Sequence, residues 1–145
     1  MSSDLIEYKR SRFKTKLPST CFYTASHCWL SEAGEGVWKV GFTKFVIRML
    51  GEPVELEFEK ALGDEVKLGE IIGWIDSFKA SSDLFSVIEG TFEGGNPLLE
   101  QNLNILKRKP YTEGWLYKIR GVPDPAHMDV NGYVSILNDS IDNYQ

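Results

Sequence analysis

The chain has 145 residues, a length that favours a single domain whose core is large enough to fold without disulfides or metal ions. Its apolar fraction of 42% and charged fraction of 26% are ordinary for a soluble globular protein. The net charge of −5 argues against nucleic acid as the main partner, because phosphate contacts require a basic surface.

The first twenty residues form a basic segment that contains Lys9, Arg10, Arg12, Lys14 and Lys16. No apolar stretch follows this segment, which argues against a secretory signal peptide, and its acidic residues are atypical of organelle transit peptides. The composition therefore predicts a basic, partly disordered arm over residues 1–20, ahead of a single folded domain over residues 21–145.

Short segments rich in β-branched and aromatic residues account for most of the remaining chain. We expect strands over residues 21–30, 37–42, 54–58, 71–76 and 114–120, a shorter strand within 62–70, and a strand pair within 84–94 that breaks at Gly90. Many short strands with glycine turns at close spacing are typical of a small β-sandwich or flattened barrel. The sequence thus predicts a mainly β fold.

Three short helices are expected beside these strands. The segment KFVIRML, residues 44–50, follows Thr43, a favoured capping residue, and stops at the next glycine. A second helix is expected over residues 96–106, with Pro97 in its first turn, and a C-terminal helix over residues 130–141.

Two cysteines and two histidines are too few for a closed zinc site. Cys21 and Cys28 would point to opposite faces of one continuous strand, so a disulfide between them is not expected. No apolar stretch approaches the ~18 residues that a membrane-spanning helix needs. We therefore expect a cytoplasmic protein in a reducing compartment, with no bound metal and no membrane span.

The segment IDSFKASSDLFSVIEG, residues 75–90, places one lysine, Lys79, between an alternating apolar run and a small polar cluster. This pattern predicts a hairpin with Lys79 at its tip, anchored to the core by Phe78, Leu84 and Phe85. Taken alone, such a lysine is most simply a solvated surface residue. No order of nucleophile and base, phosphate loop or pair of catalytic carboxylates stands out, so we predict no catalytic residues and no enzymatic activity.

Several segments, in the same order along the chain, resemble the glycine cleavage system H protein family. DSFKASSDLFSVIEG, from residue 76, resembles the segment ESVKA-SDLYSP-SG around the lipoyl lysine of that family. The segments YTASHCW (23–29), VGFT (40–43) and PYTEGWLYKI (110–119) resemble the family's YT--HEW, VGIT and PYGEGWLIKI. An ordered set of motifs is far more specific than any one of them.

The resemblance implies a barrel-sandwich hybrid fold, a C-terminal helix, and lipoic acid covalently attached to Lys79. It also implies that Asp76, Ser77, Ala80 and Asp83 flank the lysine and help the lipoate ligase or lipoyl synthase machinery to recognise it. Acylation would replace a charged, hydrated amine by a long, mostly apolar arm that ends in a dithiolane. Tethering raises the effective concentration of such an arm at a docked partner. The segment FKA lacks the methionines that biotin carriers place beside their lysine, which favours lipoate.

The chain departs from the family pattern at the cleft where the arm is expected to rest. The resemblance places Ser26, His27 and Cys28 there, and Cys28 replaces the glutamate of HEW. A neutral thiol is a poor partner for a protonated aminomethyl group, although Cys28 is also consistent with a small buried apolar residue. A lone histidine beside Trp29 is more often structural than catalytic.

This departure favours a non-enzymatic lipoyl carrier of a heterodisulfide-reductase-like sulfur oxidation system, whose cargo needs no carboxylate. The alternative is the H protein of the glycine cleavage system, which carries the aminomethyl group, and a second alternative is a non-lipoylated interaction module of the same fold. The expected partners are a heterodisulfide-reductase-like complex or the glycine cleavage enzymes, with a dihydrolipoamide dehydrogenase-like reductase. Two basic segments, residues 1–20 and Lys107 to Lys109, are either solvated surface or docking sites for an acidic partner.

Overall fold

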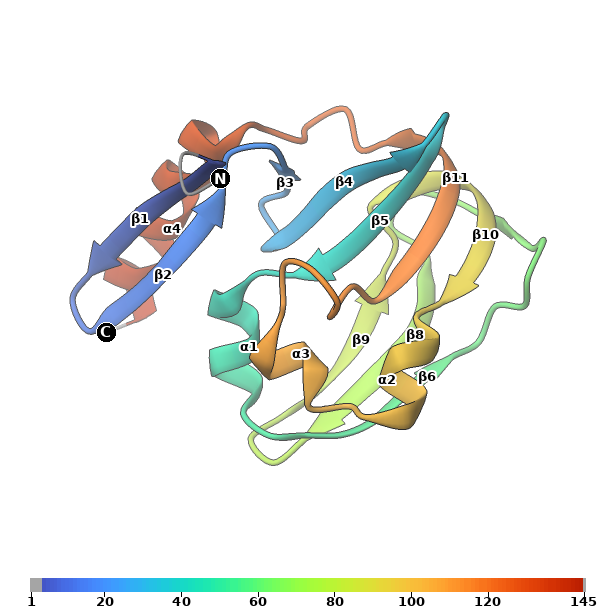
Figure 1. Cartoon of the computed structure of the whole chain (residues 1–145), viewed down its shortest axis with the longest axis horizontal. Coiled ribbons are helices and arrows are strands. Elements are labelled where there is room, and N and C mark those ends of the chain that lie inside the picture. The colour runs from blue at the N-terminus through green and yellow to red at the C-terminus, as the bar shows by residue number, and fades with distance from the viewer. Residues whose placement is uncertain (1–3, 145) are drawn as a thin grey trace.

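A computed structural model of the protein describes residues 4–144, whose strands and helices are drawn in Figure 1. The described residues form mostly antiparallel β-structure, with four helices beside the sheets. The mainly β fold and the C-terminal helix expected from the sequence are confirmed.

Two antiparallel sheets make up the body of the molecule. The larger sheet has six strands in the spatial order β3 (Phe22–Tyr23), β4 (Cys28–Gly34), β5 (Val37–Phe42), β11 (Tyr117–Pro123), β10 (Ile88–Gly95) and β7 (Glu65–Val66). The smaller sheet has three strands in the order β6 (Pro53–Phe58), β8 (Ile71–Ser77) and β9 (Ser81–Phe85). Buried residues of both sheets, among them Leu30, Ile72, Ile75, Ile88 and Ile119, form one continuous core.

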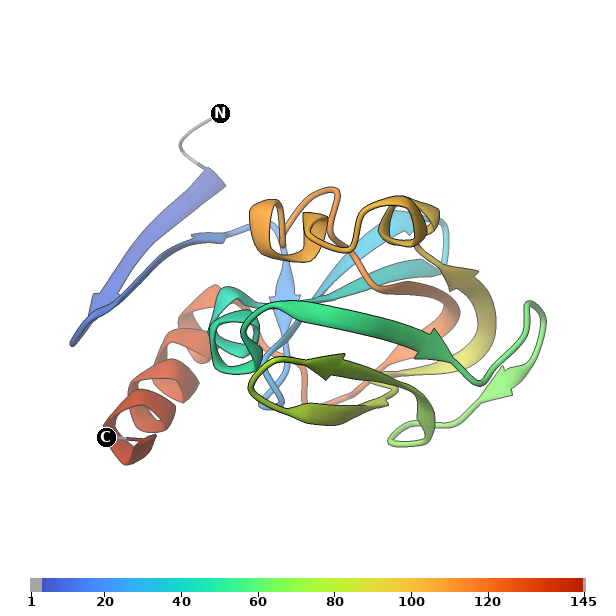
Figure 2. The same ribbon diagram turned by 90° about the horizontal axis from the view of Figure 1, so that it is seen from below.

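A second core lies to one side of the two sheets. It joins helix α4 (Val130–Tyr144) to a hairpin of strands β1 (Leu5–Arg10) and β2 (Phe13–Pro18). Figures 1 and 2 show this hairpin and α4 together at one end of the molecule. Tyr8, Phe13 and Leu17 of the hairpin are buried against it.

The N-terminal segment is therefore an ordered hairpin from Leu5 to Pro18, and the expectation of a partly disordered arm is wrong over these residues. Exposed lysines alternate with buried residues along β2, so one face of the hairpin is charged while the other is buried. Residues 1–3, which belong to the expected arm, lie outside the described residues.

The short helices follow the sequence expectations in part. Helix α1 (Lys44–Leu50) begins and ends as expected, but the Thr43 side chain does not cap it and instead bonds to the hydroxyl of Tyr133 at 2.7 Å. The helix expected over residues 96–106 is divided into α2 (Pro97–Gln101) and α3 (Ile105–Arg108). Pro97 does occupy the first turn of α2, and the side chain of Asn96 caps it.

Several strand boundaries also differ from expectation, and the last strand, β11, begins and ends three residues later than expected. The segment 21–30 is not one strand, because a turn over residues 24–27 separates β3 from β4. The break in the segment 84–94 falls at Ser86 and Val87, whereas Gly90 lies within β10. A side chain at Gly90 would meet the backbone oxygen of Arg120 at 1.9 Å, so this glycine permits close strand pairing and does not form a turn.

Candidate functional site

Lys79 lies at the tip of the hairpin between β8 and β9, as the sequence predicts. The backbone N–H of Ser77 donates to the carbonyl of Ala80 at 2.9 Å, which closes the turn. Below this turn, Asp76 pairs with Ser81 across the two strands. Lys79 is exposed, so its amine is accessible from outside the molecule.

The hairpin tip is bound to the C-terminal end of α1. The N–H of Lys79 donates to the carbonyl of Leu50 at 3.2 Å, and the N–H of Phe78 donates to that of Glu52 at 3.0 Å. The Ser77 hydroxyl lies 2.5 Å from the Leu50 carbonyl and 2.6 Å from that of Ala80, and its single proton serves one of them at a time. These contacts fix the position from which the Lys79 side chain starts.

The Lys79 side chain runs over Gly51 and reaches the last turn of α1. Its Nζ donates to the carbonyl of Arg48 at 3.3 Å, one of the carbonyls that a helix end leaves without a partner in the helix. A Cβ at Gly51 would lie 3.1 Å from the Cγ of Lys79. Gly51 also has φ of +77°, a conformation that other residues rarely adopt. Glycine is thus required both for the chain turn and for the path of the lysine.

Two grooves open beside Lys79 on either side of α1. The first, which we call the His27 groove, has a volume of about 690 Å³ and is lined by His27, Phe45, Met49 and Ser140 among others. The second, the Phe13 groove, has a volume of about 590 Å³ and is lined by apolar residues together with Arg12 and Arg48. Neither groove is lined by a carboxylate side chain of the described residues.

His27 joins the turn before β4 to helix α4. Its Nδ1 lies 2.8 Å from the hydroxyl of Tyr133, and its Nε2 lies 3.0 Å from that of Ser140. Burial lowers the pKa of His27 to about 4, so the ring is neutral near pH 7 and one ring nitrogen donates while the other accepts. His27 therefore holds one wall of the His27 groove in place.

Ser26 and Cys28, the other two expected cleft residues, differ in their exposure to solvent. Ser26 is exposed, and its hydroxyl bonds to that of Thr24 at 2.8 Å. Cys28 is buried in the main core and lines neither groove. Burial raises the pKa of the Cys28 thiol to about 11, so the thiol is protonated near pH 7.

The residues that flank Lys79 differ in their environment. Ala80 and Asp83 are exposed, whereas Asp76 and Ser77 are half-buried. Leu84, only 3% exposed, anchors the hairpin as expected, but the same expectation for two phenylalanines is wrong. Phe78 is 80% exposed because it lies in the turn, and Phe85 is 54% exposed because it points to the outer face of the smaller sheet, opposite Ile71.

Sequence reasoning missed the residues that shape the two grooves. Phe45 and Met49 lie one turn apart on α1, and their spacing was visible in the segment KFVIRML. Phe13 and Ile141 come from the two ends of the chain, and no local pattern links them. A positive φ at Gly51 could be suspected from its place directly after the helix.

Two further sequence expectations concern metals and membranes. Among the described residues, no three histidine, cysteine or acidic side chains come close enough together to hold a metal ion. The longest described helix, α4, has 15 residues, and no helix in the described range has the length and apolar character needed to cross a membrane.

Comparisons by sequence and by structure find similar proteins of the same name. Residues 21–136 match the family described as "Glycine cleavage H-protein". A "Glycine cleavage system H protein" of Kocuria rhizophila is 34% identical over 128 residues, which is 86% of this chain and 99% of that protein. The protein of the same name from Sodalis glossinidius is 34% identical over 110 residues, 76% of this chain and 83% of its own.

A solved structure resembles the fold described above. The crystal structure of a glycine cleavage system H protein from Mycobacterium marinum superposes with a TM-score of 0.75 at 25% sequence identity. The match covers 84% of this chain and 99% of that chain.

Proposed function

Since the chain belongs to the glycine cleavage H-protein family, we propose that Lys79 is the residue that carries its lipoyl group. Proteins of this family carry lipoic acid on a lysine and are carriers rather than catalysts. The observation that carries the assignment is an exposed lysine at a hairpin tip that makes two hydrogen bonds to Leu50, the last residue of α1, and one to Glu52 just after it.

The residues around Lys79 fit a lipoyl amide. The amine is accessible to a lipoylating enzyme, and Gly51 leaves space for the proximal part of the arm. An amide N–H keeps one donor, so the contact to the Arg48 carbonyl can persist after acylation. The apolar residues Phe45 and Met49 line both grooves and can cover the hydrocarbon part of the arm. When bound, the lipoyl group supplies a redox-active disulfide.

The flanking residues have separate roles in this proposal. Asp76 and Asp83 present the acidic surroundings that a lipoylating enzyme recognises, and Ala80 leaves the amine uncovered. Ser77 holds the tip against α1. His27 and Ser26 belong to the turn that borders the His27 groove, and Cys28 packs in the core below that turn.

We further propose that the carrier serves the glycine cleavage system, with the glycine cleavage enzymes and a dihydrolipoamide dehydrogenase-like reductase as partners. The matched family, both relatives described above and the solved structure all have the glycine cleavage name, which supports this alternative over sulfur oxidation. The preference for sulfur oxidation depended on Cys28 replacing a glutamate that the family pattern places in the cleft. The buried position of Cys28 weakens that reasoning, because its thiol lines neither groove.

The attachment site is tested by co-expressing the protein with a lipoate ligase and measuring its intact mass. We expect the mass of one lipoyl group on the wild type and none on Lys79→Arg. Lys67→Arg, an equal change at another exposed lysine, should keep the added mass. An unmodified wild type, or a modification that survives in Lys79→Arg, would contradict the proposal and favour a non-lipoylated interaction module.

The pathway is tested separately with the lipoylated protein. We expect glycine-dependent exchange of CO₂ when it is combined with glycine decarboxylase, and no exchange with Lys79→Arg. A lipoylated protein that supports no exchange would keep the carrier assignment but remove the glycine cleavage assignment.

A further inference from the structure

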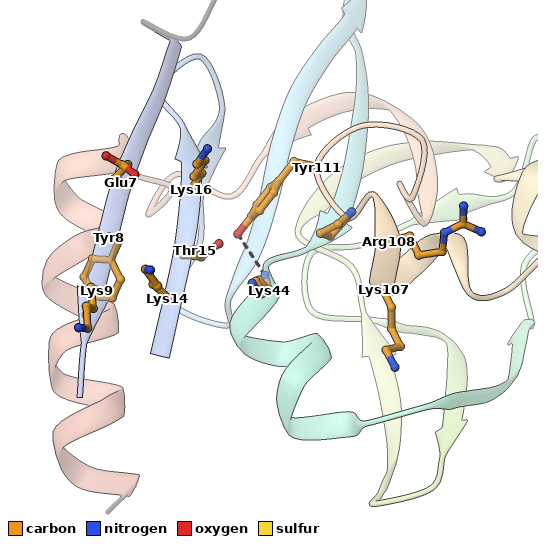
Figure 3. Close-up of a pocket in the computed structure, with 11 residues that line it drawn as sticks. Glu7, Tyr8, Lys9, Lys14, Thr15, Lys16, Lys44, Lys107, Arg108 and Tyr111 are labelled. Atoms are coloured by element: carbon orange, nitrogen blue, oxygen red, sulfur yellow. Dashed lines mark hydrogen bonds between the residues drawn. The ribbon is translucent and has the colours of Figure 1, made fainter. Parts of the chain in front are cut away.

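A groove of about 640 Å³ separates the β1–β2 hairpin from α1 and α3, on a face that the lipoyl proposal does not use. Figure 3 shows basic side chains along both of its walls. These side chains are Lys9, Lys14, Lys16, Lys44, Lys107 and Arg108, and we call the groove that they line the basic groove. Three chain segments that are remote in sequence contribute to it, and the sequence alone gave no reason to place them together.

The charge of this groove is opposite to that of the whole chain. The chain has 21 acidic and 16 basic residues, yet the groove is lined by these six cations and by one acid, Glu7. Among the described residues, only Lys107 of the six forms an ion pair with a carboxylate, that of Glu52. None of the other five forms such an ion pair among the described residues, although Lys16 lies opposite Glu7 in the β1–β2 register.

The hairpin places two of these cations against each other. Lys9 and Lys14 are directly opposite in the β1–β2 register, so their side chains leave the same face of the hairpin. Like charges in such a pair oppose strand pairing. A bound anion would offset this repulsion, which is the effect expected of a binding surface.

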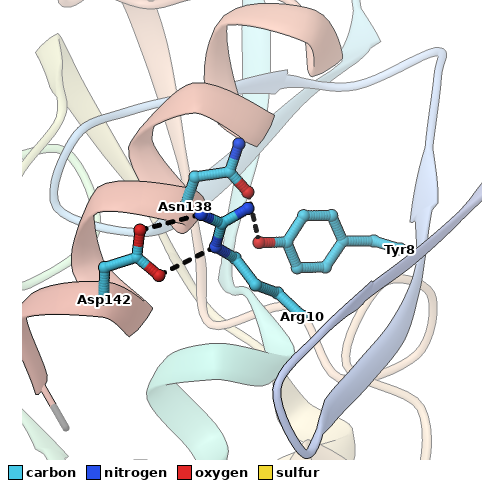
Figure 4. A network of polar contacts seen from close by, with 4 residues as sticks. All are labelled: Tyr8, Arg10, Asn138 and Asp142. Carbon is cyan, nitrogen blue, oxygen red and sulfur yellow. Dashed lines mark hydrogen bonds and ion pairs between the residues drawn. The ribbon is translucent and has the colours of Figure 1, made fainter.

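The backbone that carries these cations is held in place, because the hairpin is attached to α4. The Tyr8 hydroxyl donates to the Asn138 side-chain oxygen at 2.7 Å, and the Arg10 guanidinium donates to both oxygens of Asp142 at 2.9 and 2.8 Å. Figure 4 shows these contacts between the hairpin and α4. On the other wall, the N–H of Lys44 donates to the Tyr111 hydroxyl at 3.1 Å. A surface that is already ordered loses little conformational entropy when it binds a ligand.

The unpaired edge of β2 beside the groove favours an extended peptide over a small anion. Strand β2 pairs only with β1, so its other edge, which faces the groove in Figure 3, has no strand partner among the described residues. Free edges of this kind accept an added strand through backbone hydrogen bonds. Tyr8, Pro110 and Tyr111 supply apolar surface between the cations.

We propose that the basic groove binds an acidic segment of a partner protein, extended along the free edge of β2. The hairpin precedes residues 21–136, which match the family, so the hairpin wall of this groove is additional to the matched region, whereas the other wall belongs to it. The proposal does not depend on lipoylation of Lys79.

The experiment measures binding of fluorescein-labelled octaglutamate to the full chain by fluorescence anisotropy. We expect saturable binding that weakens as salt is added, and no binding of octaglutamine. The double variant Lys14→Ala/Lys44→Ala should bind about tenfold more weakly or worse. Lys67→Ala, an exposed lysine outside the groove, should bind as the wild type does.

Backbone NMR shifts then locate the bound peptide. We expect chemical-shift changes at residues 14–16 and 44 when octaglutamate is added. As a control for folding, Lys14→Ala/Lys44→Ala should unfold at the same temperature as the wild type, because it removes repulsion from the hairpin. The proposal is overturned if octaglutamate does not bind, or if the double variant binds it with unchanged affinity. It is likewise overturned if inorganic pyrophosphate binds the groove and octaglutamate cannot displace it.

Discussion

At the scale of single residues, His27 contributes to the site by holding its wall in place and not by carrying charge. Its ring is bonded at both nitrogens, to Tyr133 on one side and to Ser140 on the other. Its backbone has φ of +67°, which gives the turn before β4 its direction. The residue borders the His27 groove, but its neutral ring contributes shape there and no charge.

The lowered pKa of His27 predicts a specific dependence of stability on pH. In the unfolded chain the ring has a pKa near 6.5, whereas in the fold the pKa is about 4. Between these values the unfolded state binds a proton that the folded state does not, so stability is present above pH 6.5 and is lost as the pH falls toward 4. We expect a loss of about 1–2 kcal/mol, after allowance for partial exposure of the ring.

Urea unfolding at pH 7.5 and pH 5.0 measures this loss. The difference in the free energy of unfolding between pH 7.5 and pH 5.0 should be smaller in His27→Asn, because asparagine does not titrate. Asparagine also tolerates a positive φ, so the turn can keep its conformation. His127→Asn replaces the other histidine of the chain and serves as the control. An equal reduction in both variants would show that His27 is not the source.

At the scale of elements, the site is a junction between the end of α1 and the tip of the β8–β9 hairpin. The helix supplies carbonyls that have no partner within it, and the hairpin supplies N–H groups and the Ser77 hydroxyl. Gly51 lies between them and makes the junction possible, since its φ is positive and the Lys79 side chain passes over it. Neither element would hold the lysine in this position alone.

Substitution of Gly51 by alanine should affect both stability and lipoylation. The backbone conformation costs a residue with a Cβ about 1–3 kcal/mol, and the new methyl group meets the Lys79 side chain. We expect a lower free energy of unfolding in urea and slower lipoylation by the ligase, measured by intact mass over time.

Gly63→Ala is the matched control for this change. Gly63 also has a positive φ, of +92°, but a Cβ there would meet nothing within 4 Å. It should lose stability without a change in lipoylation rate. If Gly51→Ala is lipoylated as fast as Gly63→Ala, contact with the lysine path is not important.

At the scale of the whole molecule, the N-terminal hairpin and the C-terminal helix form a second core beside the carrier sheets. Leu17, Tyr23 and Tyr133 are fully buried there, and the Tyr23 and Tyr133 rings stack at 4.7 Å. The hairpin also contributes Arg12 and Phe13 to the groove beside Lys79. Residues 5–18 are therefore positioned to influence both the attachment site and the basic groove.

If this hairpin is part of the cooperative fold, a cavity within it must destabilise the whole protein. Leu17 is 0% exposed, so Leu17→Ala should lower the free energy of unfolding by about 2–5 kcal/mol in one transition. Leu5→Ala, at a residue 43% exposed in the same hairpin, should have little effect. A wild-type unfolding curve for Leu17→Ala would mean that the hairpin is an independent arm.

The order of short strands, the bounds of α1 and the tip position of Lys79 could be predicted from the sequence. These features depend on the alternation of apolar residues and on glycines near in sequence, both of which are local. The same local signals failed at residues 1–20, where the count of basic residues concealed the alternation of Phe13, Thr15 and Leu17, which are buried, with exposed lysines.

Only the tertiary structure decided what surrounds the lysine and where the basic segments meet. Phe13, Phe45 and Ile141 share one groove although they are far apart in the chain. Lys14, Lys44 and Lys107 share another groove for the same reason. Such contacts arise from burial of the hairpin and α4 against the sheets, and burial depends on non-local packing that no sequence period encodes. The sequence by itself thus determined which residue is presented at the hairpin tip, and packing decided which surfaces accompany it.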